Sequence, residues 1–408
     1  MSTVATDGDA KRPEVALQTK GAIYGAGMFS NSMSDVASVV LPLWLAGLGY
    51  SAAAIGLVVG AKHILPLFLA IHGGAMIDRL GARRVMLASA ATSLVVLPLF
   101  PVQPVLVLIV LIQMINGFAS ALCWIGAQAC FGRIMYGHPD YAGPFAFSLR
   151  LGSFMGPPLG GLAFDLAGIW GGIAVLTVWA AGTLAAAWCL PAGRALPSGR
   201  QRVGLADLAP RLSDYRAAYG LIAVPAMATV LSITVFRIAA SSIQDSFYPV
   251  YLHSIGMPAT QIGILITVSS ALAAVSALLV GRLSRLASPL WLLVATTMGS
   301  IAFIAVTPLF VSMPALMLMA ALRGVCMGIS QPLMLSLLVG AAERNSQGLG
   351  VSLRTTANRA AAAVTPMTMG LVAAVVGLNA SFLLIGAALM TGMTWVAVRA
   401  HVSRPVGD

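Results

Sequence analysis

The sequence predicts an all-α polytopic membrane protein whose twelve transmembrane helices form two pseudo-symmetric six-helix bundles. The first observation is composition: 59% of the 408 residues are hydrophobic and 9% are charged, which is more apolar surface than a soluble core can bury. The second is a series of apolar stretches of about 20 residues, the length at which a helix crosses about 30 Å of hydrocarbon with its backbone hydrogen bonds satisfied internally. The third is an internal repeat.

The apolar stretches follow one another with short polar turns between them. The seventh is long, and Pro225 is an alternative start for it. The expected spans cover residues 22–46, 52–72, 85–103, 105–131, 144–166, 171–190, 221–252, 259–281, 288–310, 314–341, 348–376 and 378–398.

A shift of 207 positions superimposes the first half of the chain on the second, bringing Gly56 onto Gly263. A slightly smaller shift brings Arg150 onto Arg354. Two related halves place a substrate site between them, near the middle of the membrane. The expected domains are a cytoplasmic N-terminal tail (1–20), a first bundle (21–190), a cytoplasmic linker (191–217), a second bundle (218–400) and a cytoplasmic C-terminal tail (401–408).

The formal net charge of +11 raises the question of a nucleic-acid partner, and the positions of the basic residues answer it. If the N-terminus is inside, the loop Lys and Arg residues fall on the cytoplasmic side and none falls in an expected outside loop. This asymmetry is the positive-inside pattern. We therefore expect an integral protein of the plasma (inner) membrane with both termini cytoplasmic and no nucleic-acid partner. The first twenty residues lack the apolar core of a cleaved signal peptide.

Two motifs carry a family resemblance. From Gly74 to Arg84 the chain reads Gly-x-x-x-Asp-Arg-x-Gly-x-Arg-Arg in the turn between the second and third spans. This pattern resembles the corresponding loop of major facilitator superfamily transporters, and the resemblance covers residues from about 20 to 400. It implies a gating loop made of Gly74, Asp78, Arg79, Gly81, Arg83 and Arg84.

We expect Asp78 to lie near the start of the eleventh span, where unsatisfied amides favour an anion. The loop would then close the cytoplasmic side in the outward-facing state and open when the protein faces inward. A topology signal without a gating role is the alternative, because three arginines alone serve that purpose.

The second motif lies in the fifth span, where residues 152–161 match Gly-x-x-x-Gly-Pro-x-x-Gly-Gly. It resembles the antiporter motif of proton-driven drug and metabolite exporters in the same superfamily. Glycines let helix backbones approach closely, and proline removes an amide donor and bends a helix. The motif implies a leak-tight bend facing the other half, and the alternative is an ordinary packing seam. Its gating residues are Gly152, Gly156, Pro157, Gly160 and Gly161.

Two carboxylates lie well within the spans, Asp35 in the first and Asp245 in the seventh. A carboxylate at this depth is costly unless it is paired or wetted, so it is a functional candidate by default. Asp35 is the favoured proton-coupling residue and Asp245 the second. The alternatives are a structural ion pair of Asp35 with Lys62, and neutralisation of Asp245 by Arg237.

The spans also contain an excess of cations and several amides. A buried guanidinium presents paired donors that suit carboxylate, hydroxamate or phosphate groups, so we expect an anionic or zwitterionic substrate. Arg150 and Arg354 lie nearer the cytoplasmic ends and are interpreted as mainly structural. Gln113 stands where exporters of this branch carry an arginine, which puts proton coupling by the usual route in doubt. The expected substrate-binding residues are Asn31, Lys62, Gln113, Arg237, Gln244 and Arg323.

The sequence indicates a transporter and not an enzyme. It shows no metal-ligand spacing, no phosphate-binding loop and no soluble domain, so no cofactor or metal is expected. The favoured function is a monomeric secondary transporter in which protons move in as an amphiphilic or anionic drug or metabolite, such as a siderophore, moves out. The alternative is an importer, symporter or uniporter of a small organic anion. A membrane-bound sensor without transport activity is an alternative from a different functional class.

Overall fold

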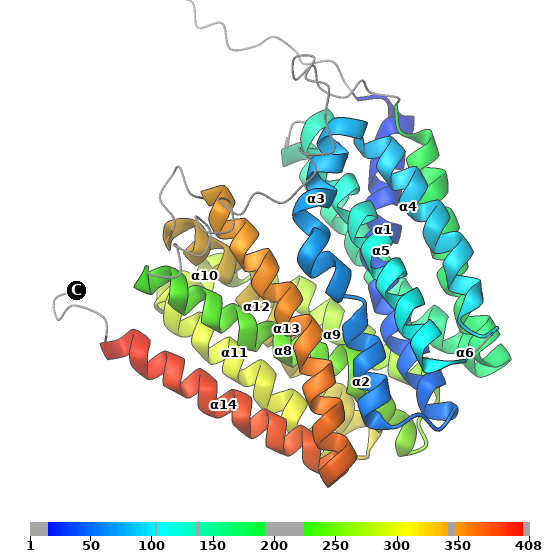
Figure 1. Cartoon of the computed structure of the whole chain (residues 1–408). Helices are drawn as coiled ribbons and strands as arrows, with labels where there is room; N and C mark the ends of the chain where they lie inside the picture. The colour runs from blue at the N-terminus through cyan, green and yellow to red at the C-terminus, as the bar shows by residue number, and fades with distance from the viewer. Residues whose placement is uncertain (1–14, 103, 136–138, 192–223, 342–346, 403–408) are drawn as a thin grey trace, which may run out of the picture.

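The computed structural model describes residues 15–102, 104–135, 139–191, 224–341 and 347–402, and within them every regular element is helical. Figure 1 shows the helices arranged in two groups, one from the first half of the chain and one from the second. The elements are α1 (Leu17–Gly47), α2 (Ala52–Ala61), α3 (Ile64–Leu80), α4 (Ala82–Val96), η1 (Leu97–Leu99), α5 (Leu106–Ile134), α6 (Pro139–Cys189), α8 (Pro225–Ser254), α9 (Ala259–Ala277), α10 (Val280–Leu286), α11 (Pro289–Ala305), η4 (Thr307–Leu309), α12 (Met313–Ala341), α13 (Gln347–Val376) and α14 (Leu378–Val402).

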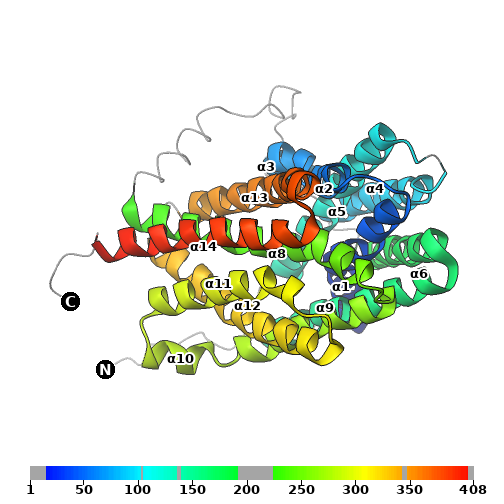
Figure 2. The same cartoon turned by 90° about the horizontal axis from the view of Figure 1, so that it is seen from below.

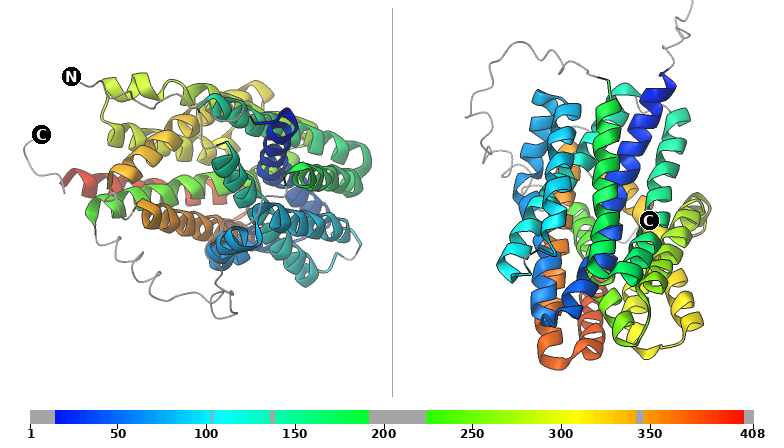
Figure 3. Two further views of the ribbon diagram at one scale, coloured as in Figure 1. Left: turned by 90° about the horizontal axis from the view of Figure 1, so that it is seen from above. Right: turned by 90° about the vertical axis from the view of Figure 1, so that its right-hand side faces the viewer.

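By length and composition alone, nine of the described helices can cross a membrane, or ten if α10 and α11, bent by 117°, form one span. The 51-residue α6 is two helices joined at a break, where Gly168 adopts a φ of 57°. A side-on view shows α1 between the two halves of α6 (Figure 3, right). Each expected span falls on a described helix, on one half of α6 or, as for 52–72, on consecutive helices, which confirms the predicted fold class. Most of the predicted linker and tails lie outside the described residues.

The two groups of helices separate toward one face of the molecule (Figure 1) and meet at the other, which faces the viewer in Figure 2. We call the first the termini face, because α1 begins and α14 ends there, and the second the opposite face. Contacts between the groups are made chiefly by α6 with α9 and by α2 with α13. We call these two contact regions the α6/α9 seam and the α2/α13 seam.

Glycines allow the close approach at both seams. A Cβ atom on Gly56 of α2 would overlap the carbonyl of Pro366 in α13, and one on Gly263 of α9 would overlap the carbonyl of Pro157 in α6. Gly56 and Gly263 are 207 positions apart, which is the spacing of the repeat in the sequence. The repeat is therefore confirmed as a pseudo-symmetry of the packing.

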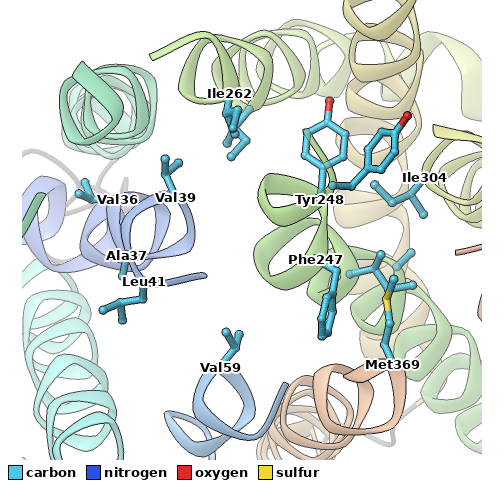
Figure 4. Packing of buried hydrophobic residues seen from close by; sticks show 14 of the residues in the cluster. Val36, Ala37, Val39, Leu41, Val59, Phe247, Tyr248, Ile262, Ile304 and Met369 are labelled. Carbon is cyan, nitrogen blue, oxygen red and sulfur yellow. The ribbon is translucent and has the colours of Figure 1, made fainter. Parts of the chain in front are cut away.

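An apolar layer fills the space between the two halves near the seams. Figure 4 shows Val39 of α1 on the side of Ile262 of α9, with Val59 of α2 opposite and Phe247 of α8 beside it. Their side chains are at most 5% exposed. Buried apolar side chains from both halves exclude water and ions between the cavity side and the opposite face.

Candidate functional site

Two adjoining cavities lie between the halves, on the termini-face side of the apolar layer. The larger has a volume of about 570 Å³ and the smaller about 280 Å³. Five residues line both: Ser34, Lys62, His63, Trp124 and Arg359. The larger extends toward the termini face along α5 and α13, where Gln128, Arg354 and Asn358 border it. Together they form a central cavity that both halves line.

Lys62 and His63 face the same cavity because the second span is broken between α2 and α3. Adjacent residues of a regular helix point about 100° apart and do not share a face. Here Pro66 cannot donate to the carbonyl of Lys62, and Gly117 of α5 packs against that carbonyl. The backbone N–H of His63 donates instead to Gly60, at 3.0 Å. The break therefore exposes both basic side chains to the cavity.

A hydrogen bond between the halves joins His63 to Arg359 of α13, with 3.3 Å between Nδ1 and Nη1. Arginine has no acceptor, so Nδ1 of His63 accepts and the ring proton lies on Nε2. His63 is therefore the neutral tautomer with its Nε2–H free to donate. Sequence analysis did not select His63 or Arg359 as ligand residues; the helix break marked by Pro66 is the signal that points to His63.

The two predicted proton-coupling residues both reach the central cavity. Asp35 borders the smaller part and Asp245 the larger. Among the described residues, no ion pair within 4.0 Å joins either carboxylate to Lys62 or Arg237. The alternatives of fixed Asp35–Lys62 and Asp245–Arg237 pairs are therefore not formed in this conformation.

The predicted substrate residues divide into two groups. Asn31, Lys62 and Gln113 line the smaller cavity, as expected. Gln244 and Arg323 instead border a separate space of about 10 Å³, too small for a solute, where Arg323 donates to Ser269 at 3.4 Å. In this conformation neither residue lines the main cavity, and their role in substrate binding stays a prediction.

Arg237 also lies outside the cavities described here, although it stands two steps of four residues before Asp245 and such positions form a stripe along a helix. A step of four residues overshoots one helical turn by about 40°, so the stripe drifts around α8. One turn earlier Thr234 already contacts Sδ of Met334 in α12, at 3.0 Å. Arg237 is accordingly 5% exposed among helices of its own half, and its Nε has no hydrogen-bond partner.

The glycine–proline motif of α6 faces two different partners. Gly152, Gly156 and Gly160 pack against α1 of the same half, next to Ser32 and Val36. Gly161 and Pro157 instead contact α9 of the other half. Pro157 and Gly161, and not the three glycines that pack on α1, are therefore the residues of the predicted bend that face the other half.

Asp165, which sequence analysis passed over, lies at the end of the first half of α6. Its carboxylate accepts from the backbone N–H of Ala259 at 2.9 Å, and from the N–H and hydroxyl of Thr260 at 2.8 and 2.6 Å. These are the first residues of α9, whose amides have no partner within their own helix. Asp165 therefore caps a helix of the other half at the opposite face.

The predicted gating loop lies at the turn between α3 and α4. Gly81 makes this turn with a φ of 88°. Asp78 forms an ion pair with Arg133 of α5, and Arg83 donates to the carbonyl of Trp188 at 2.9 Å. Both partners belong to the same half. Residues 342–346, which precede α13, lie outside the described residues, so the expected contact of Asp78 with the eleventh span is not tested.

The family model of the Major Facilitator Superfamily matches residues 23–236 and 230–407. The chain belongs to the major facilitator superfamily. The predicted superfamily is therefore confirmed, and so is its class as a secondary transporter and not an enzyme. None of the curated proteins matches the sequence significantly.

Solved structures show the same fold at low sequence identity. The nucleoside transporter NupG has a TM-score of 0.77 at 15% identity, covering 94% of this chain and 99% of that one. A bacterial homologue of the human lysosomal transporter Spinster, inward-facing and unoccupied, has a TM-score of 0.71 at 14% identity, covering 95% and 96%. A POT family transporter in complex with a thioalcohol-conjugated peptide has 0.74 at 12%, covering 94% and 96%. These neighbours do not single out the drug-exporter branch.

Proposed function

We propose that this superfamily member is a proton-driven exporter of an amphiphilic, anionic or zwitterionic small molecule, with the central cavity as its transport site. The observation that carries the proposal is the placement of Asp35, an acid at membrane depth that borders a cavity shared by both halves. A carboxylate there can alternate between charged and neutral forms as the halves rock. The glycine-lined seams, with Pro157 and Gly161 in α6, supply the barrier that prevents a proton leak.

The proposed orientation places the termini face in the cytoplasm, as the distribution of Lys and Arg favours. The cavity then opens inward in the conformation described here. In the outward-facing state, the loop of Asp78, Arg79, Arg83 and Arg84 would close this side, and Asp78 would leave Arg133 for the start of α13. The site is complete within one chain, so a monomer is the proposed functional unit.

A second candidate, import or symport of a small organic anion, is favoured by the charge of the cavity. Three cations line it, Lys62, Arg354 and Arg359, against two carboxylates, Asp35 and Asp245. A bound anion favours the protonated form of a nearby carboxyl, so by linkage an anion and a proton bind together. A cationic group beside Asp35 competes with the proton instead. A solute with a net negative charge therefore favours symport with protons. A zwitterionic solute, or an amphiphile with a cationic end, favours antiport.

The proposal is tested with the Asp35→Asn variant. Asparagine keeps the shape of the side chain but cannot release a proton, so we expect uphill transport driven by a pH gradient to be abolished, with substrate binding and downhill exchange retained. The assay measures transport into proteoliposomes. The transported solute is first identified as one that accumulates in cells that lack the protein. Gradient-driven transport at the wild-type rate would exclude Asp35 as the carrier and leave Asp245.

The direction of coupling is read in the same vesicles. Substrate that moves against the proton flux in the wild type supports the exporter. Substrate that accumulates on the side to which protons flow establishes the symporter, and movement independent of the pH gradient establishes a uniporter. If no solute is transported at all, the sensor reading replaces both.

A further inference from the structure

We propose that Lys62, His63 and Arg359 form an oxyanion-binding subsite, which holds the carboxylate or phosphate group of the transported solute between the two halves. The inference rests on the proposed transport function and deepens it by naming the substrate group and the residues that hold it. The subsite lies where the two cavities join, because all three residues line both.

The three side chains present donors of complementary kinds. Lys62 offers an ammonium group, His63 the Nε2–H left free by its bond to Arg359, and Arg359 the N–H groups that do not contact His63. The bond to His63 also restrains the guanidinium, so less side-chain freedom is lost when an anion binds. Charge-assisted bonds of this kind are the strong ones in a partly desolvated site.

The charge of the cavity favours such a ligand. Among the described residues, no carboxylate lies within 4.0 Å of Lys62 or Arg359. Even with Asp35 and Asp245 ionised and His63 neutral, three cations against two carboxylates leave one uncompensated positive charge. An uncompensated charge at membrane depth is costly. An oxyanion with one negative charge neutralises the cavity.

The subsite is divided between the halves. Lys62 and His63 come from the break between α2 and α3, while Arg359 belongs to α13. It lies beside the α2/α13 seam, in which Gly60 packs against Ala363. When both halves hold one group, the affinity for that group depends on the relative position of the halves. Transport by alternating access requires this dependence.

The test uses matched probes that differ in charge and hardly in shape. Purified protein in detergent micelles without added lipid is heated with 4-phenylbutyrate, with its neutral amide 4-phenylbutyramide, or with phenyl phosphate. Binding to the folded state raises the unfolding midpoint with ligand concentration. We expect at least one of the two oxyanions to raise the midpoint and the amide to have no effect; whichever oxyanion acts distinguishes a carboxylate subsite from a phosphate subsite.

Variants locate the binding. Arg359→Gln and Lys62→Met should each lower the apparent affinity for the oxyanion by about tenfold or more. Arg359→Lys keeps the charge without the planar fork and should fall between wild type and Arg359→Gln. Arg399→Gln is the matched control, because Arg399 lies over the ring of Trp395 in α14 and lines neither cavity. His63→Asp, which adds a repelling charge, is prepared in parallel in case one variant does not fold.

Equal shifts with the acid and the amide, no shift with either oxyanion, or equal affinities of Arg359→Gln and Arg399→Gln would each overturn the subsite. A shift produced by phosphatidylglycerol alone, and lost in Arg359→Gln, would assign the subsite to a lipid headgroup and also overturn the proposal. Oxyanion binding that persists while no transport is found leaves the subsite standing and removes the transport proposal. Transport without oxyanion binding removes the subsite and leaves the transport proposal standing.

Discussion

The two seams that join the halves are related by the internal repeat, yet they are held differently. Both rely on a glycine against a proline-containing helix, Gly263 at the α6/α9 seam and Gly56 at the α2/α13 seam. At the first, Asp165 of one half caps the start of α9 in the other. At the second, α2 is capped from within its own half by Ser51, which accepts from Ala54 at 3.3 Å.

This difference separates two kinds of contact between the halves. Closely packed side chains exclude water and tolerate changes of side-chain volume poorly. The hydrogen bonds of a charge-assisted cap are directional and are lost together. The α6/α9 seam combines both, and the α2/α13 seam has packing beside the cavity residue Arg359. We infer that Asp165 sets how readily the opposite face opens, and three predictions test this comparison.

The largest effect is expected from filling a seam. Gly161→Leu, whose Cβ alone would overlap the carbonyl of Ala259, should cost the closed seam about 1–3 kcal/mol and shift the conformational equilibrium by roughly 5–150-fold toward opening of the opposite face. Gly56→Leu should act similarly. The measurement is the labelling rate of a Val39→Cys reporter, buried in the apolar layer, in a cysteine-free background.

Gly132→Leu is the matched control for that prediction, because no heavy atom lies within 4 Å of a Cβ at Gly132. Wild-type labelling in Gly161→Leu, or equally fast labelling in the Gly132→Leu control, would contradict the role of close packing at the seam.

A smaller effect is expected from removing the cap between the halves. Asp165→Ala removes the carboxylate that accepts from Ala259 and Thr260, and a lost cap is worth about 0.5–2 kcal/mol, so labelling of the Val39→Cys reporter should rise by about tenfold. Ser51→Ala removes a cap that lies within one half. It should lower thermal stability without changing the labelling rate, because both conformations lose the same bond. Equal labelling rates in the two variants would show that the seams do not differ in this way.

The smallest effect is expected at the termini face, with the opposite sign. Asp78→Asn should weaken the state in which this face is closed, so labelling of the Val39→Cys reporter should fall and transport should slow. A change of only a few-fold is expected, because Asp78→Asn also removes the ion pair with Arg133 from the conformation with the open termini face. The Asp78 side chain is 66% exposed there, and exposed ion pairs contribute about 0–1 kcal/mol. Faster labelling in Asp78→Asn would show that the loop does not hold the termini face closed.

Sequence analysis predicted the features that depend on local composition or on regular spacing. Apolar length placed the spans, and the 207-position repeat anticipated the paired glycines Gly56 and Gly263. Asn31 and Asp35 are four residues apart and so lie on one face of the first span, and both border the cavity. The same spacing does not bring Arg237 to the cavity, because a stripe that drifts by about 40° per turn faces different neighbours at different depths. Gln244 misses the cavity because it points about 100° away from its neighbour Asp245.

Taken alone, the sequence determined that the chain is a membrane-spanning helical repeat with acids and bases at membrane depth. Hydropathy, glycine spacing and charge depend only on the order of residues. Only the tertiary structure decided which of those groups meet. The bond from Arg359 to His63 joins residues 296 positions apart, and the cap of Asp165 on Thr260 joins residues 95 apart. Such contacts depend on which helices pack together and where each is broken, and no periodicity within a single helix specifies that.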